Sequence, residues 1–190
     1  MTVFLLGLVG FFGIHSIAIV APGWRERTIA SIGAPAWRAA YSVASLIAFV
    51  AMIHGYGIAR QAPVVVYTPP VGLRHVAMLL MLPAFTMLLS AYLPGRIKTR
   101  LKHPMLAAVK LWAVAHLLAN GTLADLLLFG GFLVWAVVDR ISVGRRPRGP
   151  VSTAAGGRLN DAIAVIGGLA LYGVFVVWLH GRWIGVPLLP

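Results

Sequence analysis

The chain has 190 residues, of which 60% are hydrophobic and only 11% are charged. A soluble domain carries about a quarter charged residues, so this composition excludes a soluble globular protein, and the high apolar content excludes a disordered chain. The absence of cysteine excludes disulfides, zinc–thiolate sites, iron–sulfur clusters and a thiol nucleophile, while 16 Lys and Arg against 4 Asp and Glu give a formal charge of +12.

The apolar residues fall into six segments that qualify, or nearly qualify, as membrane spans, for which about 20 mostly apolar residues are needed. In chain order they are expected at about Thr2–Ala21, Trp37–Ala59, Val71–Leu93, Pro104–Ala119, Thr122–Val138 and Leu159–Leu179. The prediction is therefore an all-α, polytopic bundle of six transmembrane helices that forms one domain over residues 1–190.

Local features refine three of these segments. The first has no basic residue before Arg25 and no clear cleavage site, so we expect it to be retained rather than removed as a signal peptide. Pro83 is expected to kink the third segment. The short fourth segment is separated from the fifth only by Asn120-Gly121, which predicts a tight antiparallel hairpin.

Basic residues concentrate in alternate loops. Together with their flanks, the loops after the first, third and fifth segments hold Arg25, Arg27, Arg38, Arg96, Lys98, Arg100, Lys102, Arg140, Arg145, Arg146, Arg148 and Arg158. The other side holds only Arg60, Arg74 and Arg182. The positive-inside rule then predicts that the basic loops are cytoplasmic and that both termini are periplasmic.

This distribution also accounts for the net charge. Basic loops are attracted to an anionic inner leaflet by about 1 kcal/mol per Lys or Arg near the surface. The lipid bilayer is therefore the expected partner of these loops, and nucleic acid is not. DNA binding by Arg145, Arg146 and Arg148 is the minor alternative.

Several kinds of active site are excluded by the scarcity of acidic residues. The four that occur lie near segment ends and form no pair at helical spacing: Glu26, Asp125, Asp139 and Asp161. This argues against a two-carboxylate hydrolase and against a di-iron carboxylate site. The chain also lacks a Gly-x-Ser-x-Gly elbow and a phosphate-binding loop.

Histidine is the strongest candidate for chemistry, because within a membrane span it is costly and faces the protein interior. Six occur: His15, His54, His75, His103, His116 and His180. His15 and His116 lie deepest, each about 20 Å from one end of its span. For both, a metal ligand and a hydrogen bond to a neighbouring carbonyl are open alternatives. The other four lie near span ends, where we expect contact with water, a lipid headgroup or, for His103, a helix cap.

The fourth segment places other candidates beside its histidines. Trp112, His116 and Asn120 share one face at i, i+4 spacing, which suits either a flat macrocycle or ordinary packing. Lys110 either extends toward the inner surface or meets a cofactor carboxylate or Asp139. His103 and His116 are about 140° and about 20 Å apart on this helix, so a two-histidine haem site must draw on different helices.

Glycines at helical spacing predict close helix contacts in the first and last segments. Small residues let the backbones of membrane helices approach each other closely. The residues concerned are Gly7, Gly10 and Gly13 in the first segment and Gly167, Gly168 and Gly173 in the last.

The fourth segment resembles the signature of the NnrU family, in Lys102-His103-Pro104 and in the run LWAVAHLLANG from Leu111 to Gly121. The run LLLFGGF at 126–132 and His15-Ser16 in the first segment continue the resemblance, which covers essentially the whole chain. It implies a bacterial inner-membrane protein linked to denitrification and nitric oxide metabolism.

The NnrU family is similar to the 15-cis-zeta-carotene isomerase, an integral membrane enzyme that uses haem b. That similarity implies a haem-b cofactor with His15 and His116 as iron ligands. Trp112, Asn120 and Lys110, which lie on the same segment as His116, are the further candidates for cofactor binding. The similarity also implies an isomerase-like reaction, which starts when reduction of the iron frees one histidine. The chain departs from the isomerase at Gly130-Gly131, where that enzyme has a His-His pair.

Two further readings stay open. His103-Pro104 at a helix start also resembles the Arg-His-Pro motif of membrane methyltransferases, although Lys102 replaces the arginine and the downstream acidic pair is missing, so the likeness concerns architecture. The alternative to a haem protein acting on a small apolar or redox substrate is a non-catalytic membrane factor. Such a factor, or a small-molecule carrier, would support nitrite and nitric oxide reduction.

Overall fold

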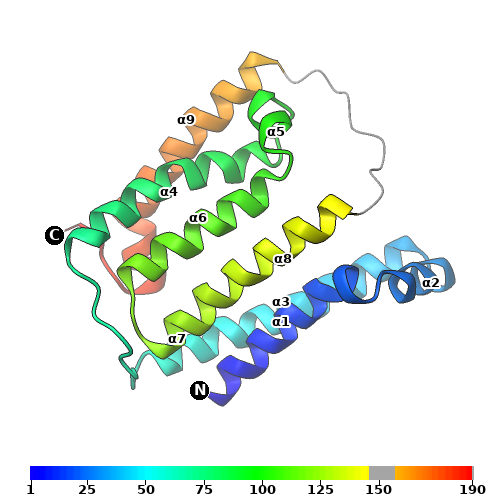
Figure 1. Cartoon of the computed structure of the whole chain (residues 1–190), viewed down its shortest axis with the longest axis horizontal. Coiled ribbons are helices and arrows are strands. Elements are labelled where there is room, and N and C mark those ends of the chain that lie inside the picture. The colour runs from blue at the N-terminus through cyan, green and yellow to red at the C-terminus, as the bar shows by residue number, and fades with distance from the viewer. Residues whose placement is uncertain (146–156, 190) are drawn as a thin grey trace. The chain divides into compact units, whose positions relative to one another are not determined.

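The computed structural model describes residues 1–145 and 157–189, and the regular structure in those ranges is helical (Figure 1). In chain order the elements are α1 (Thr2–Val20), α2 (Pro22–Ile32), α3 (Ala34–Ala59), α4 (Gly72–Ser90), α5 (Arg96–Leu101), α6 (Pro104–Ala119), α7 (Leu123–Asp125), the π-helical η1 (Leu126–Gly130), α8 (Gly131–Arg145), α9 (Arg158–Val174) and the π-helical η2 (Phe175–Ile184). The one β-type pairing in the described residues is an isolated antiparallel bridge between Val65 and Thr122. The predicted all-α class is confirmed.

Five helices in the described ranges are long and apolar enough to cross a membrane. They are α1, α3, α4, the continuous helix Leu123–Arg145 and the continuous helix Arg158–Ile184. The predicted fourth span, α6, is apolar but has only 16 residues. The chain is thus a multi-pass membrane protein by the length and composition of its helices. Arg146 and Arg148, counted among the basic loop residues above, lie outside the described residues.

The chain divides into two compact units. The first comprises Met1–Tyr67 and Thr122–Leu128, and the second comprises the described residues of Thr68–Gly121 and Phe129–Pro190. That the two units together form a single domain over residues 1–190 stays a prediction.

In the first unit, α1 and α3 pack through two reciprocal glycine contacts. A Cβ atom at Gly7 would overlap the backbone of Met52, and a Cβ atom at Gly55 would overlap the backbone of Phe4. The Phe4 and Met52 side chains are completely or almost completely buried, with 0% and 1% exposure. The absence of side chains at Gly7 and Gly55 therefore allows the two backbones to approach closely, as in other membrane helix pairs.

The glycine prediction is thus confirmed for part of each set. Gly7 and Gly168 face the backbone of a neighbouring helix, whereas a Cβ atom added at Gly13 or Gly173 would meet no side chain or neighbouring backbone of the described residues within 4 Å. Gly55, which was not predicted, makes the contact that completes the α1–α3 pair. Spacing identifies a face of a helix but not the neighbour that meets it.

The Gly55→Ala variant should destabilise the protein by about 1–3 kcal/mol, because the added methyl group collides with backbone that cannot move aside. Gly57→Ala is the matched control, since it lies on the same helix and a Cβ there meets nothing within 4 Å among the described residues. Thermal unfolding in detergent measures both. Equal midpoints for the two variants would contradict the proposed close contact.

The polar helix α2 was not predicted, because it contains no apolar run. Pro22 occupies its first turn, where the missing N–H is not needed, and Gly33 ends it with a φ of 84°. None of its residues is buried. A short polar helix that follows a membrane span directly is suited to the membrane–water interface.

In the second unit, α4 packs against both α6 and α9. A Cβ atom at Gly168 of α9 would lie 2.7 Å from Thr86 Cα of α4, so this contact again depends on the absence of a side chain. α6 packs against α8, which confirms the hairpin predicted for the fourth and fifth segments. Helix α4 continues through Pro83 without a break in its helical structure.

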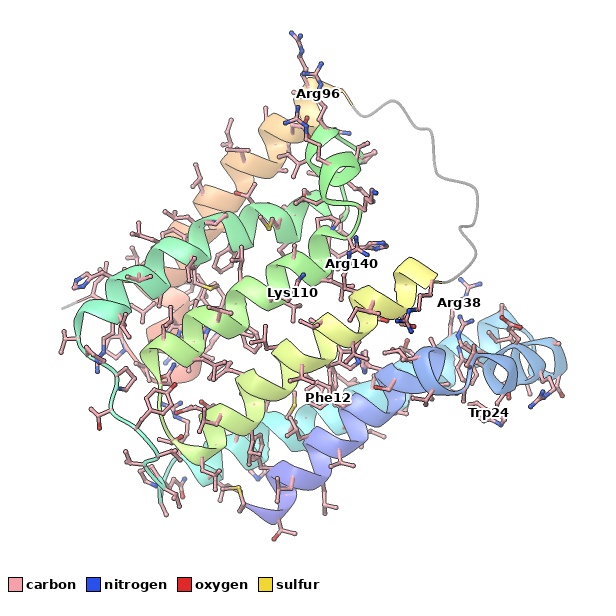
Figure 2. All side chains as sticks on the ribbon, in the orientation of Figure 1. Phe12, Trp24, Arg38, Arg96, Lys110 and Arg140 are labelled. Atoms are coloured by element: carbon pink, nitrogen blue, oxygen red, sulfur yellow. The ribbon has the colours of Figure 1, made fainter. Side chains whose placement is uncertain are left out.

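Asp161 has a structural role in this unit. Its carboxylate accepts hydrogen bonds from the backbone N–H groups of Arg96 (3.0 Å) and Ile97 (3.1 Å) at the start of α5. The neighbouring Asn160 side chain donates to the carbonyl oxygen of Pro94 at 2.7 Å. Figure 2 shows Arg96 at this end of the unit. These bonds attach the α4–α6 connection to the start of α9 and satisfy the first N–H groups of α5.

Candidate functional site

His15 is held in one orientation by its own helix. Its Nδ1 atom lies 2.8 Å from the carbonyl oxygen of Phe11, four residues earlier in α1. The Phe11 ring stacks on the imidazole at 4.0 Å with an interplanar angle of 26°, and the Tyr41 ring of α3 meets it edge-on at 5.4 Å. Because a carbonyl oxygen can only accept, Nδ1 carries the proton, and in the neutral ring Nε2 carries the lone pair.

His116 is held in the same way in the second unit. Its Nδ1 atom lies 2.8 Å from the carbonyl oxygen of Trp112, and the Phe129 ring stacks on it at 4.5 Å, again at 26°. Phe129 belongs to the π-helical turn η1, and Trp112 lies against both rings, at 5.1 Å from His116 and 4.9 Å from Phe129. The Asn120 side chain donates to the carbonyl oxygen of His116 at 2.9 Å. The predicted face of Trp112, His116 and Asn120 is therefore present.

Both deep histidines thus share one construction, with the Nδ1 proton given to the carbonyl four residues earlier and a phenylalanine stacked on the ring. A hydrogen bond to a neighbouring carbonyl, one of the two alternatives predicted for these histidines, is confirmed at both. The same bond is typical of metal-binding histidines, whose second ring nitrogen is fixed by a carbonyl or carboxylate. His15 lies in the first unit and His116 in the second, and iron ligation by either stays a prediction.

A pocket of about 280 Å³ opens beside His15 in the first unit. It is lined by residues of α1 around His15, by Arg25 of α2, and by the first turns of α3, with Trp37, Arg38, Tyr41 and Ser42. Figure 2 shows Arg38 near the start of α3, at the same end of this unit as Trp24 of α2. The pocket therefore combines an oriented imidazole with aromatic rings and two guanidinium groups.

Lys110 lies midway along α6 and is half-buried (Figure 2). Extension toward the inner surface, contact with a cofactor carboxylate and contact with Asp139 all stay predictions for this side chain. No group of three or more His, Cys, Asp or Glu that could hold a metal ion occurs in residues 1–145 and 157–189.

The remaining histidines have surface environments. His54 and His75 are exposed, and His180 Nδ1 lies 2.6 Å from the carbonyl oxygen of Val186. Contact of these side chains with water stays a prediction. His103 is the N-cap residue of α6, but its side chain makes no capping hydrogen bond. Burial lowers the pKa of His103, the charges of Arg140 and Lys102 lower it further, and Asp139 opposes them.

Sequence reasoning missed a buried polar cluster around Asp125, which is only 5% exposed. The hydroxyl of Tyr56 donates to Oδ1 of Asp125 at 2.5 Å. The backbone N–H and the hydroxyl of Thr122 donate to Oδ2 at 3.0 and 2.6 Å, and the Asp125 N–H donates to the Thr122 hydroxyl at 3.3 Å. Both carboxylate oxygens of this buried side chain therefore have hydrogen-bond donors.

Two further residues surround this cluster. The guanidinium of Arg60 lies 5.8 Å from the centroid of the Tyr56 ring, within the range of a cation–π interaction. Burial raises the pKa of the Tyr67 hydroxyl, and the nearby Asp125 carboxylate raises it further. The capping pattern Thr-x-x-Asp at 122–125 could have identified the helix start. The contact with Tyr56 joins residues 69 positions apart and left no local signal.

A model of the NnrU protein family matches residues 3–188. No curated protein and no solved structure matches the chain.

Proposed function

Because this chain belongs to the NnrU family, we propose that it is a six-span protein of the bacterial inner membrane that binds haem b through His15 and His116. The observation that supports the proposal most is the shared construction of these two histidines. In each, a 2.8 Å hydrogen bond from Nδ1 to the helix backbone leaves Nε2 as the nitrogen with the lone pair.

The residues present fit a haem group. An iron porphyrin needs only one or two ligands from the protein, so a cluster of three ligating side chains is not required. Arg25 and Arg38 beside His15 are suited to its carboxylates, and the Trp37 and Tyr41 rings to its flat face. When bound, haem would supply one-electron chemistry or an iron that takes up a small ligand.

In this proposal the chain's own residues orient the two imidazole rings and exclude water from them. The carbonyl groups of Phe11 and Trp112 fix the tautomer and direction of His15 and His116. Stacked phenylalanine rings prevent each imidazole from turning and keep water from one of its faces. Such a protein would act in denitrification and nitric oxide metabolism on a small apolar or redox substrate, or catalyse an isomerase-like reaction.

An absorption spectrum of detergent-purified protein, oxidised and reduced, tests this proposal. Expression with ample haem should yield a coloured protein with a Soret band that shifts on reduction. A colourless protein would overturn the haem proposal, and the non-catalytic membrane factor or small-molecule carrier would take its place.

The proposed topology is supported by charge and helix order. The basic stretches Arg96–Lys102 and Arg140–Arg158 flank α6 and α8, and the positive-inside rule puts both on the cytoplasmic side. Since the helix Leu123–Arg145 is long enough to cross, α6 must also cross for the chain to return. Its 16 residues span about 24 Å, and local bilayer thinning accommodates the difference from a core of about 30 Å.

A reporter fused after Pro190 should therefore be active only if it functions in the periplasm. Alkaline phosphatase and a fluorescent protein that folds only in the cytoplasm make a complementary pair of reporters. A fluorescent C-terminal fusion with inactive phosphatase would contradict the six-span topology.

A further inference from the structure

The pocket beside His15 carries a concentration of positive charge that does not depend on an iron ligand and that suits more acids than haem. Arg25 comes from α2 and Arg38 from α3, so two separate helices direct guanidinium groups to one cavity. Neither arginine is in an ion pair with a carboxylate of the described residues. Arg38 donates its Nε–H to the carbonyl oxygen of Ala34 at 3.3 Å, which leaves the terminal nitrogens of the guanidinium for other acceptors.

Apolar and aromatic side chains form the rest of the cavity. Ile14 and Ile17 line it from α1, and Trp37 and Tyr41 line it from α3. Trp37 meets Trp24 of α2 edge-on at 5.7 Å. Tryptophan is enriched at membrane–water interfaces, because its ring is apolar and its N–H can reach water.

We propose that this pocket binds an amphiphilic anion, whose carboxylate or phosphate group is held by Arg25 and Arg38. The apolar body of the ligand lies against Ile14, Ile17 and the aromatic rings. Guanidinium groups bind carboxylates and phosphates with paired, charge-assisted hydrogen bonds, which makes arginine the usual residue for such groups. The volume of about 280 Å³ suits the acid end of a ligand together with the portion next to it.

Two kinds of ligand combine an apolar body with such an acid group: an anionic phospholipid from the bilayer, and a porphyrin with its propionates. The inference depends on the two arginines and not on iron, so it stands apart from the proposed ligation by His15. Haem bound at His15 would be one instance of such a ligand, and a lipid would be another.

The experiment compares the wild type with Arg25→Gln, Arg38→Gln and the double variant, all purified in neutral detergent from cells grown without added haem. Arg27→Gln is the matched control, because Arg27 lies on the same helix as Arg25, is exposed, and does not line the pocket. Two probes are titrated by native mass spectrometry and tryptophan quenching: phosphatidylglycerol, and metal-free protoporphyrin IX with its dimethyl ester for comparison.

Each single substitution should weaken binding of the acid probe by roughly tenfold, since it removes a charge-assisted contact. The dimethyl ester should bind equally weakly to all variants, and Arg27→Gln should match the wild type. An effect on protoporphyrin alone identifies a porphyrin site, and an effect on phosphatidylglycerol alone identifies a lipid site. Equal affinities in the double variant and in Arg27→Gln, or no saturable binding to the wild type, would overturn the proposal. Because the porphyrin probe lacks iron, this result is independent of whether His15 ligates haem.

Discussion

Replacement of His116 by alanine should abolish haem binding or reduce it sharply, and His15→Ala should have the same effect. Each change removes the Nε2 lone pair that we propose as an iron ligand. Loss of an outer-shell partner of a metal ligand costs roughly 10–100-fold in affinity, and loss of the ligand itself should cost more. Haem content per protein and the reduced absorption spectrum measure the effect.

His75→Ala is the matched control, because its side chain is exposed and is not among the residues that line the pocket beside His15. Added imidazole should restore part of the spectrum in the His116→Ala and His15→Ala variants, which a purely structural role would not produce. If the two variants and the control retain the spectrum of the wild type, the ligand assignment is wrong.

The second large effect is expected at the buried cluster around Asp125. Tyr56→Phe should destabilise the protein by about 1.5–3 kcal/mol, because the deleted hydroxyl donates to a buried carboxylate and hydrogen bonds to charged groups contribute that much. Thermal unfolding in detergent at fixed lipid content is the measurement. Tyr92→Phe removes the same atom from a side chain that is 72% exposed and should change stability by less than about 0.5 kcal/mol.

A double-mutant cycle isolates the contribution of the Asp125 charge to this bond. Asp125→Asn keeps the shape of the side chain but removes its charge, so Tyr56→Phe should cost less in that background. Equal costs of Tyr56→Phe in the two backgrounds would show that the charge of Asp125 adds nothing to the contribution of the hydroxyl.

Much of the fold follows from local sequence, because an apolar run of span length has few alternatives in a membrane protein. The predicted segment Pro104–Ala119 matches α6 at both ends, where Pro104 starts the helix and Asn120 follows it. α2 was not predicted, because a polar helix lacks the apolar run on which the prediction of the other helices depends. Its signals were Pro22 and Gly33, which mark a start and a stop.

The candidate site was predictable in its residues but not in its construction. The predicted depth of His15 and His116 in their segments singled them out, and i, i+4 spacing placed Trp112 and Asn120 beside His116. The stacking of Phe129 on His116 depends on a π-helical turn, for which an ordinary helical period gives no warning. Tertiary contacts of this kind are decided by neighbours that are distant in sequence.

The bond between Tyr56 and Asp125 also determines the order in which the protein can be completed. Its two residues are 69 positions apart, and ribosomes add about 5–20 residues per second, so about 3 to 14 s of synthesis separate them. During that interval α1 and α3 can already associate through Gly7 and Gly55, while α4, α5 and α6 are still being synthesised. A nascent chain that stops before Thr122 therefore contains the helix pair but not the finished first unit, and the whole intervening segment with α4, α5 and α6 must be synthesised before that unit can close.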